Sequence, residues 1–133
     1  MFSFTRTLWR SCIAAAAALA FVAGAVEDAA VLTEPAASEV LRTRRGDCSE
    51  HARLFVALAR AAGIPAREVT GLAWIGDDVR AFGRHSWAEV ELDGRWREVD
   101  PTGGVLPAHA AHVRTTGRVV PDGVVFELLD TRR

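Results

Sequence analysis

The chain has 133 residues, the usual length of a single domain; half of them are hydrophobic and a quarter are charged. This composition excludes a disordered chain and indicates a folded globular protein. The formal net charge is −1, with 16 basic against 17 acidic residues, so there is no electrostatic reason to expect nucleic acid or an anionic membrane surface as a partner.

The first 25 residues have the pattern of a secretory signal. Arg6 and Arg10 precede an apolar stretch over residues 11–23, and Ala23-Gly24-Ala25 supplies a cleavage pattern of small residues. A basic start, an apolar middle of roughly 7–15 residues and such a site are typical of a signal peptide. We predict a signal peptide or N-terminal anchor over residues 1–25, and a secreted or periplasmic protein. The alternative is an alanine-rich core helix of a cytoplasmic domain.

The two cysteines have different expected fates. Cleavage after Ala25 would remove Cys12 and leave Cys48 as the single thiol. Outside the cytoplasm a single thiol has no partner for an internal disulfide. It must be buried, paired with another chain or kept for its reactivity.

A linker is predicted over residues 26–37, followed by a short helix over residues 38–43. The next helix has the clearest signals in the chain. Asp47 is a good N-cap, and Glu50 three residues later completes a capping box. Apolar residues then recur at helical spacing, namely Ala52, Leu54, Phe55, Val56, Leu58 and Ala59. Gly63 and Pro65 end this helix, so it covers about residues 48–62, with Cys48 in its first turn.

Strands are predicted in the second half of the chain. Asp93-Gly94 is a strong signal for a two-residue hairpin loop. The predicted strands cover residues 67–75, 85–92, 95–100 and 124–129. One main helix followed by antiparallel strands predicts the α+β class.

The position of Cys48 suits a nucleophile. A thiol attacks as its thiolate, and the free N–H groups and dipole of a helix N-terminus stabilise that anion. A nearby histidine can take the thiol proton, and a carboxylate can orient the histidine.

The hairpin indicates which histidine and carboxylate would meet. With Asp93 and Gly94 as the loop, Trp87 lies opposite Asp100, and His85 lies two residues further along the same strand. Side chains alternate between faces of a strand, and opposed residues share a face. His85 and Asp100 are therefore diagonal neighbours, ~7–8 Å apart at the backbone and within reach of each other's side chains.

Four runs of sequence resemble, in chain order, the motifs of transglutaminase-like proteins. They are the nucleophile motif, the rest of the active-site helix, the histidine strand and the aspartate strand, at residues 45–52, 58–67, 85–90 and 96–102. The resemblance covers about residues 38–113 and implies a papain-like fold, with the cysteine helix packed on an antiparallel sheet. By this resemblance Cys48 is the nucleophile, His85 the base and acid, and Asp100 the residue that orients His85.

The predicted domain covers residues 38–133. Its predicted function is thiol-dependent acyl transfer or hydrolysis at peptide or glutamine-type amides, as a protease, amidase or cross-linking enzyme with a protein or peptide substrate. No cofactor is predicted, because no glycine-rich phosphate loop is present. No metal site is predicted either, because the spacing of His85, His109 and His112 matches no zinc signature.

Two alternatives remain. The chain is a truncated or inactive transglutaminase-like domain that binds peptides, or it belongs to the cell-wall endopeptidases with an Asp-Cys-Ser helix start. The His-x-Trp-x-Glu strand argues against the endopeptidases. Related domains have more chain before the cysteine helix, including a donor to the oxyanion hole. Here the Cys48 N–H can serve as one donor, and the second is unassigned.

Four further residues have expected roles. Trp87 shares the face of the predicted site and would form a wall of the substrate cleft. His51 is expected to be a packing or hydrogen-bonding residue one turn after the cysteine. Glu89 and Glu98 are expected to be charges on the strand surface.

Overall fold

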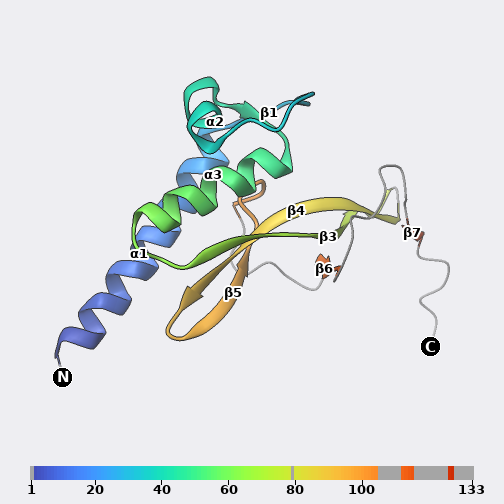
Figure 1. Ribbon diagram of the computed structural model, residues 1–133. Helices are drawn as coiled ribbons and strands as arrows, with labels where there is room; N and C mark the ends of the chain where they lie inside the picture. Colours follow the sequence, from blue (N-terminus) through green and yellow to red (C-terminus); the bar gives the residue numbers. More distant parts are fainter. Residues whose placement is uncertain (1, 79, 105–111, 116–125, 128–133) are drawn as a thin grey trace, which may run out of the picture.

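A computed structural model describes residues 2–78, 80–104, 112–115 and 126–127 (Figure 1). The helices are α1 (Phe2–Ala25), α2 (Ala37–Thr43) and α3 (Cys48–Ala61). The strands are β1 (Glu27–Asp28), β2 (Arg45–Gly46), β3 (Ala66–Gly76), β4 (Ala81–Leu92), β5 (Arg95–Val99), β6 (His112–Arg114) and β7 (Phe126–Glu127). The helices lie on one side of an antiparallel sheet, so the predicted α+β class is confirmed.

The main sheet has the strand order β5-β4-β3-β6, with β7 paired to the start of β4. The predicted hairpin register is confirmed, because Leu92 pairs with Arg95 across the turn. Asp93 and Gly94 have φ angles of 56° and 69°, the left-handed values that a two-residue hairpin loop requires. Strand β4 begins at Ala81, four residues before the predicted start at His85. The extra residues, Ala81 to Arg84, pair with the last part of β3. Of the last predicted strand, residues 126 and 127 form β7, and the others lie outside the described residues.

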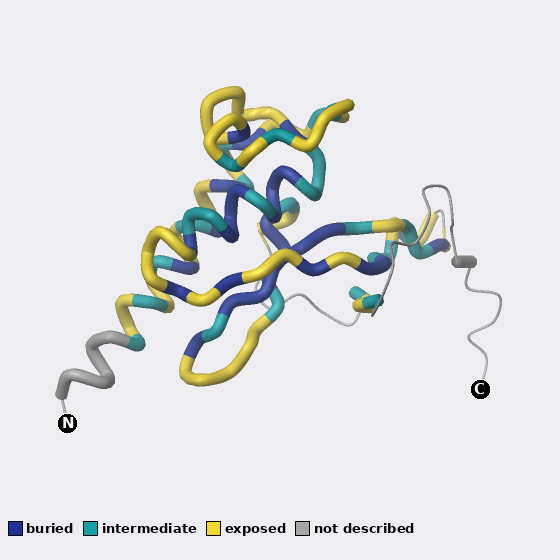
Figure 2. The backbone as a smooth tube through the Cα atoms, viewed as in Figure 1, coloured by how far each residue is buried: buried dark blue, intermediate teal, exposed yellow. Residues whose placement is uncertain are grey.

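The core lies between α3 and the sheet, and Figure 2 shows buried residues concentrated where the two meet. Alternate side chains of β4, together with one residue of β5, face the apolar stripe of α3. The buried residues of this contact are Leu54, Phe55, Val56 and Ala59 from α3 and Ala88, Val90, Leu92 and Val99 from the sheet. The apolar face of α3, with its helical spacing, and the alternate apolar residues of β4 thus pack into one core.

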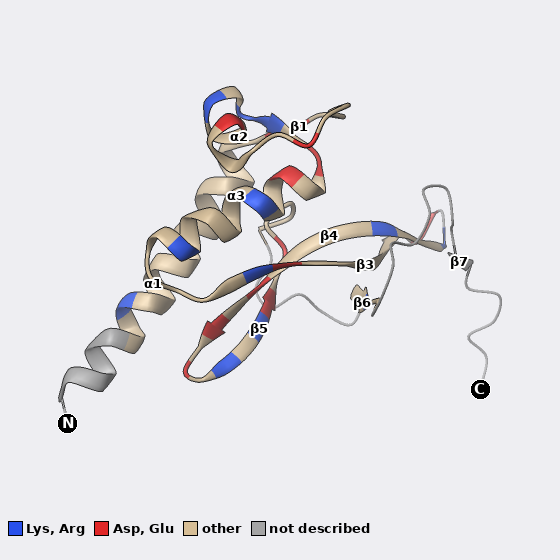
Figure 3. Ribbon diagram, viewed as in Figure 1, with Lys and Arg blue, Asp and Glu red and all other residues tan. Residues whose placement is uncertain are grey.

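Helix α1 runs beside α3 (Figure 1) and contributes Ala15, Leu19 and Val22 to the same core. Its other face is apolar and open, since Trp9 and Ile13 are exposed. Figure 3 shows that charges lie mainly on the other elements. Among the described residues, the segment Leu8–Ala25 is the one helix long and apolar enough to cross a membrane. One side of α1 packs on α3, whereas only 17% of the segment Leu8–Ala25 is buried, and a signal or anchor at residues 1–25 stays a prediction.

The predicted linker over residues 26–37 is in part ordered structure. Strand β1 pairs in parallel with β2, with Glu27 opposite Arg45 and Asp28 opposite Gly46. Val26 just before it is buried in the core. The segment before α2 is therefore held against the two residues that lead into Asp47 and α3. The sequence did not reveal this strand, because two residues are too few to show a pattern.

The docking of α1 can be tested with a matched pair of substitutions. Leu19→Ala should lower the free energy of unfolding by about 2–5 kcal/mol, because the side chain is 5% exposed and its loss leaves a cavity. Ile13→Ala, on the same helix but 53% exposed, should change it by no more than about 0.5 kcal/mol. Urea unfolding at equilibrium measures both. Equal effects of the two substitutions would contradict the packing of α1 on α3.

Candidate active site

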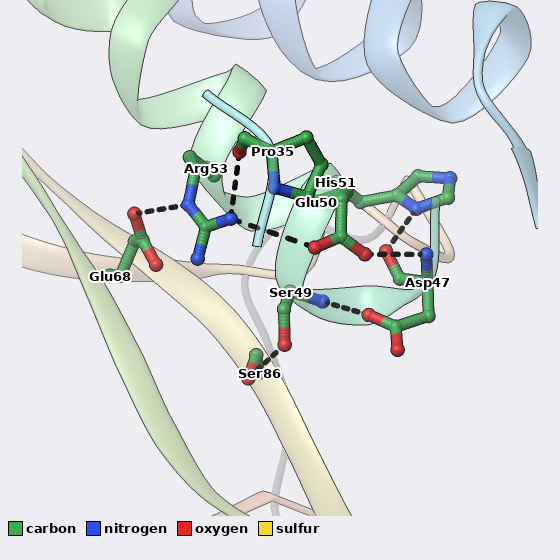
Figure 4. A network of polar contacts seen from close by, with 8 residues as sticks. All are labelled: Pro35, Asp47, Ser49, Glu50, His51, Arg53, Glu68 and Ser86. Carbon is green, nitrogen blue, oxygen red and sulfur yellow. Dashed lines mark hydrogen bonds and ion pairs between the residues drawn. The ribbon is translucent and has the colours of Figure 1, made fainter. Parts of the chain in front are cut away.

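The start of α3 is fixed by the predicted capping box (Figure 4). The Asp47 carboxylate accepts a hydrogen bond from the Ser49 N–H at 2.8 Å, and the Glu50 carboxylate accepts one from the Asp47 N–H at 3.0 Å. Cys48 is the first residue of the helix. Its thiol therefore lies at the positive end of the helix dipole, where backbone N–H groups without helical partners stabilise an anion.

Buried polar side chains hold this helix start in place (Figure 4). His51 is buried, and its Nδ1 lies 2.6 Å from the Asp47 carbonyl oxygen, while its Nε2 lies 3.3 Å from that of Val26. The expected hydrogen-bonding role of His51 is confirmed. Arg53 donates to the Pro35 carbonyl at 2.9 Å and forms an ion pair with Glu68 of β3 at 3.7 Å. The first turns of α3 are thus tied to the segment before them and to the sheet.

The helix start lies against β4 at the predicted histidine. The Ser49 and Ser86 hydroxyl oxygens are 3.3 Å apart, which brings the first turn of α3 to the residue next to His85. The Cys48 side chain lies close enough to His85 to raise the pKa of the imidazole. This contact between helix and hairpin is the step that sequence spacing could not provide.

His85 and Asp100 meet as the hairpin register predicts. The His85 Nε2 lies 2.7 Å from the Asp100 Oδ2, and the two side chains are 17% and 9% exposed. The Asp100 Oδ1 accepts a hydrogen bond from the Thr102 N–H at 3.0 Å. An ionised carboxylate only accepts hydrogen bonds, so His85 carries its proton on Nε2. Its Nδ1 is then left to receive a proton from the thiol.

The charges of this pair stabilise each other. Burial disfavours the His85 cation, but hydrogen bonds to Asp100 and Cys48 outweigh it and raise the pKa of His85 to about 9. Burial likewise disfavours the Asp100 anion, but the hydrogen bond from His85 and its charge hold the pKa of Asp100 well below its usual range. The site therefore favours a protonated imidazole beside an ionised carboxylate.

Trp87 lies behind the histidine. Its side chain is fully buried, and its ring stacks on that of His85 with centroids 6.1 Å apart and planes inclined by 22°. It does not line either of the cavities next to the site. In this structure Trp87 is a buried support of the imidazole, and its place in a cleft wall stays a prediction.

His112 is a member of the cluster that sequence reasoning missed. Its Nε2 lies 2.7 Å from the same Asp100 Oδ2, and its side chain is 7% exposed. Pairing of β6 with β3 sets His112 opposite Ala73. A strand of three residues gives no periodic signal, so the sequence showed only a histidine in a loop region. His109 lies outside the described residues.

His85, Asp100 and His112 offer ligand atoms within 4.8 Å of one another, which on distance alone is close enough for a metal ion. Each imidazole Nε2 is directed at the carboxylate oxygen at hydrogen-bond distance. We therefore interpret the cluster as a hydrogen-bonded one.

Two cavities adjoin the predicted site. One of about 320 Å³ is lined in part by Trp74, His85, Asp100 and His112. The other, of about 470 Å³, is lined in part by Asp47, Ser49, Glu68 and Ser86. Arg84 lines both. The two cavities therefore meet at Arg84 of β4, next to His85 and Ser86.

Glu89 differs from its expected place on the strand surface. It is buried and forms ion pairs with Arg67 of β3 and Arg114 of β6. Arg114 also bonds Glu98 of β5 at 3.0 Å. The expectation for Glu89 was wrong because Arg67 of β3 and Arg114 of the edge strand β6 both reach this carboxylate and pair with it.

Comparisons with known proteins agree with this arrangement. The model of the transglutaminase-like superfamily matches residues 13–101. The chain therefore belongs to the transglutaminase-like superfamily. The matched segment begins inside α1 and ends just after Asp100, so it includes Cys48, His85 and Asp100.

Human and mouse kyphoscoliosis peptidase are each 33% identical to this chain over 72 residues, which are 50% of this chain and 11% of theirs. A candidate cysteine protease from Cytophaga hutchinsonii superposes with a TM-score of 0.66 at 27% identity, over 90% of this chain and 46% of that one. The periplasmic domain of TgpA from Pseudomonas aeruginosa, bound to ethylmercury, gives a TM-score of 0.51 at 30% identity, over 70% and 38%. The fold is the papain-like transglutaminase core.

The coupling of His85 to Asp100 predicts how stability depends on pH. The folded pKa of His85 is raised from an ordinary 6.5 to about 9, so its contribution is full below pH 6.5 and is lost as pH rises toward 9. In a Cys48→Ala chain, which removes titration of the thiol, Asp100 alone still raises this pKa. The free energy of unfolding should then fall above pH 6.5, by at most about 1.4 kcal/mol per pH unit.

Urea unfolding from pH 5 to 9 measures this decline. The control is a Cys48→Ala, Asp100→Asn chain, in which His85 has lost its anionic partner and the decline should be absent. A flat profile in the single variant, or the same decline in both chains, would contradict the coupling.

Proposed function

We propose that this protein is a thiol-dependent enzyme that hydrolyses or transfers the acyl group of peptide or glutamine-type amides. Cys48 is the nucleophile, His85 the base and acid, and Asp100 the residue that orients His85. One observation carries the proposal: His85 bonds Asp100 at 2.7 Å, and Cys48, at a capped helix start, lies close enough to raise the pKa of the same imidazole.

The acylation step follows from these contacts. His85 takes the Cys48 proton on Nδ1, and the thiolate attacks the amide carbonyl to form a C–S bond. The oxyanion that develops can accept a hydrogen bond from the Cys48 N–H. When the C–N bond breaks, His85 returns the proton to the leaving amine, and a thioester remains on Cys48. The raised pKa of His85 keeps the imidazole protonated until the amine leaves.

The second step decides between hydrolysis and transfer. Water attacks the thioester to give an acid, or a primary amine attacks to give a new amide; in both cases His85 takes the proton and the thiol is restored. The relatives described as a peptidase and a candidate cysteine protease support hydrolysis. The family to which the chain belongs supports transfer as the second outcome.

A location outside the cytoplasm is a further part of the proposal. It is supported by the apolar composition of α1 and by the solved periplasmic domain of TgpA. N-terminal sequencing of protein recovered from each cell fraction tests it. A chain that starts at Met1 and is found in the cytoplasm would contradict it.

The reactivity of Cys48 tests the enzyme proposal. The experiment uses a Cys12→Ser chain, because Cys12 is exposed and would react as well. Alkylation by iodoacetamide should stay fast well below pH ~8.5, where a free thiol is largely protonated. His85→Ala should slow the alkylation of Cys48 at least about tenfold at pH 6, because the thiolate loses its cationic partner. The control is Ser3→Ala, a substitution far from Cys48 in the chain.

The substrate assay then separates the two outcomes. Glutamine peptides should give an acyl-enzyme on Cys48 in the mass spectrum, and added hydroxylamine should capture the acyl group. A thiol that titrates like free cysteine in both chains would sink the enzyme proposal. It would favour a domain that binds peptides without catalysis.

A further inference from the structure

The structure joins two imidazoles to one carboxylate oxygen. The Nε2 atoms of His85 and His112 each lie 2.7 Å from the Asp100 Oδ2, and the Thr102 N–H bonds the Asp100 Oδ1. Because an ionised carboxylate has no proton to donate, both imidazoles must carry hydrogen on Nε2. Asp100 thus accepts from three donors, on β4, on β6 and in its own turn.

His112 is held by a ring contact and by strand pairing. Its ring meets the edge of the buried Trp87 ring, with centroids 5.2 Å apart and planes inclined by 77°. The same Trp87 ring stacks on His85. Pairing of β6 with β3 fixes the backbone of His112 opposite Ala73. One indole therefore sets the orientation of both imidazoles toward Asp100.

A donor at this position matters because Asp100 is 9% exposed. An anion removed from water needs hydrogen bonds to stay ionised, and each bond to a charged group is worth more than a neutral one. The hydrogen bond from His112 helps to hold the pKa of Asp100 below its usual range. Without that donor the carboxylate would take up a proton at higher pH and lose its hold on His85.

The other ionisable groups near Asp100 and His85 lie on α3, β4 and β6. Among the described residues, the cavity beside Asp100 is lined by Arg84 and His85 of β4 and by His112, while the β3 residues that line it carry no charge. Cys48 of α3 raises the pKa of His85. On β6, Arg114 bonds Glu89 and Glu98.

We propose that His112 is a positioning residue that donates from Nε2 to Asp100 and keeps this carboxylate ionised and directed at His85. The inference rests on the proposed function, because the loss of this donor would change the reactivity of the Cys48 thiol through His85. His112 acts through Asp100 and does not touch the substrate.

Two variants of His112 test the role of the donor in the Cys12→Ser chain. His112→Phe keeps a ring against Trp87 but removes the donor, whereas His112→Gln keeps an N–H donor near the position of Nε2. The acid limb of the pH profile of Cys48 alkylation is measured in both. His112→Phe should move that limb up by about one pH unit, which is the loss of one hydrogen bond to a charged group. His112→Gln should leave it near that of the parent chain.

The test compares the pH position of the acid limb in the two variants. An unchanged acid limb in His112→Phe, or equal shifts in both variants, would overturn the proposal, because a merely structural role would not distinguish the donor. An acid limb that moves only in His112→Phe supports it.

A second measurement does not depend on any variant folding. In the parent chain labelled with ¹⁵N-histidine, the nitrogen chemical shifts of His112 at pH 7–8 report which ring nitrogen carries hydrogen. Hydrogen on Nε2 is expected, and a tautomer with hydrogen on Nδ1 alone would overturn the proposal. If the thiol of the parent chain is not activated, the proposed function fails, while these shifts still decide whether His112 bonds Asp100.

Discussion

The arrangement of the site depends on one buried carboxylate. Asp100 is nearly covered by protein, yet it stays ionised because three donors surround its two oxygens. These donors come from β4, from β6 and from the turn that follows β5. A single anion thus links segments that are distant in the sequence. Since a buried charge without partners is costly, the same requirement that stabilises the fold also orients His85.

The other half of the site depends on the start of α3. The capping box fixes Cys48 at the positive end of the helix, while Arg53 and the Ser49–Ser86 contact tie this end to β3 and β4. Strand β1 pairs with β2 directly before the helix. Cys48 is therefore held between a rigid segment and the sheet, which is the precondition for a lasting contact with His85.

Two residues show why sequence patterns failed at particular places. Glu89 was expected on the surface of β4, but it is buried and forms an ion pair with Arg114 of β6. His112 belongs to a strand of three residues, which is too short to show alternation. Both errors have one cause. A short strand from a distant part of the chain joins the edge of the sheet beside β3, and nothing local to either residue encodes that pairing.

The sequence by itself determined the local elements: the capped helix with Cys48 in its first turn, and the hairpin register that makes His85 and Asp100 diagonal neighbours. These follow from short-range physics, namely capping, helical and alternating periodicity, and the geometry of a two-residue turn. Only the tertiary structure decided that α3 meets the hairpin at His85, that α1 enters the core, that Trp87 is buried and that His112 joins Asp100. Those contacts depend on packing between distant segments, for which spacing along the chain carries no signal.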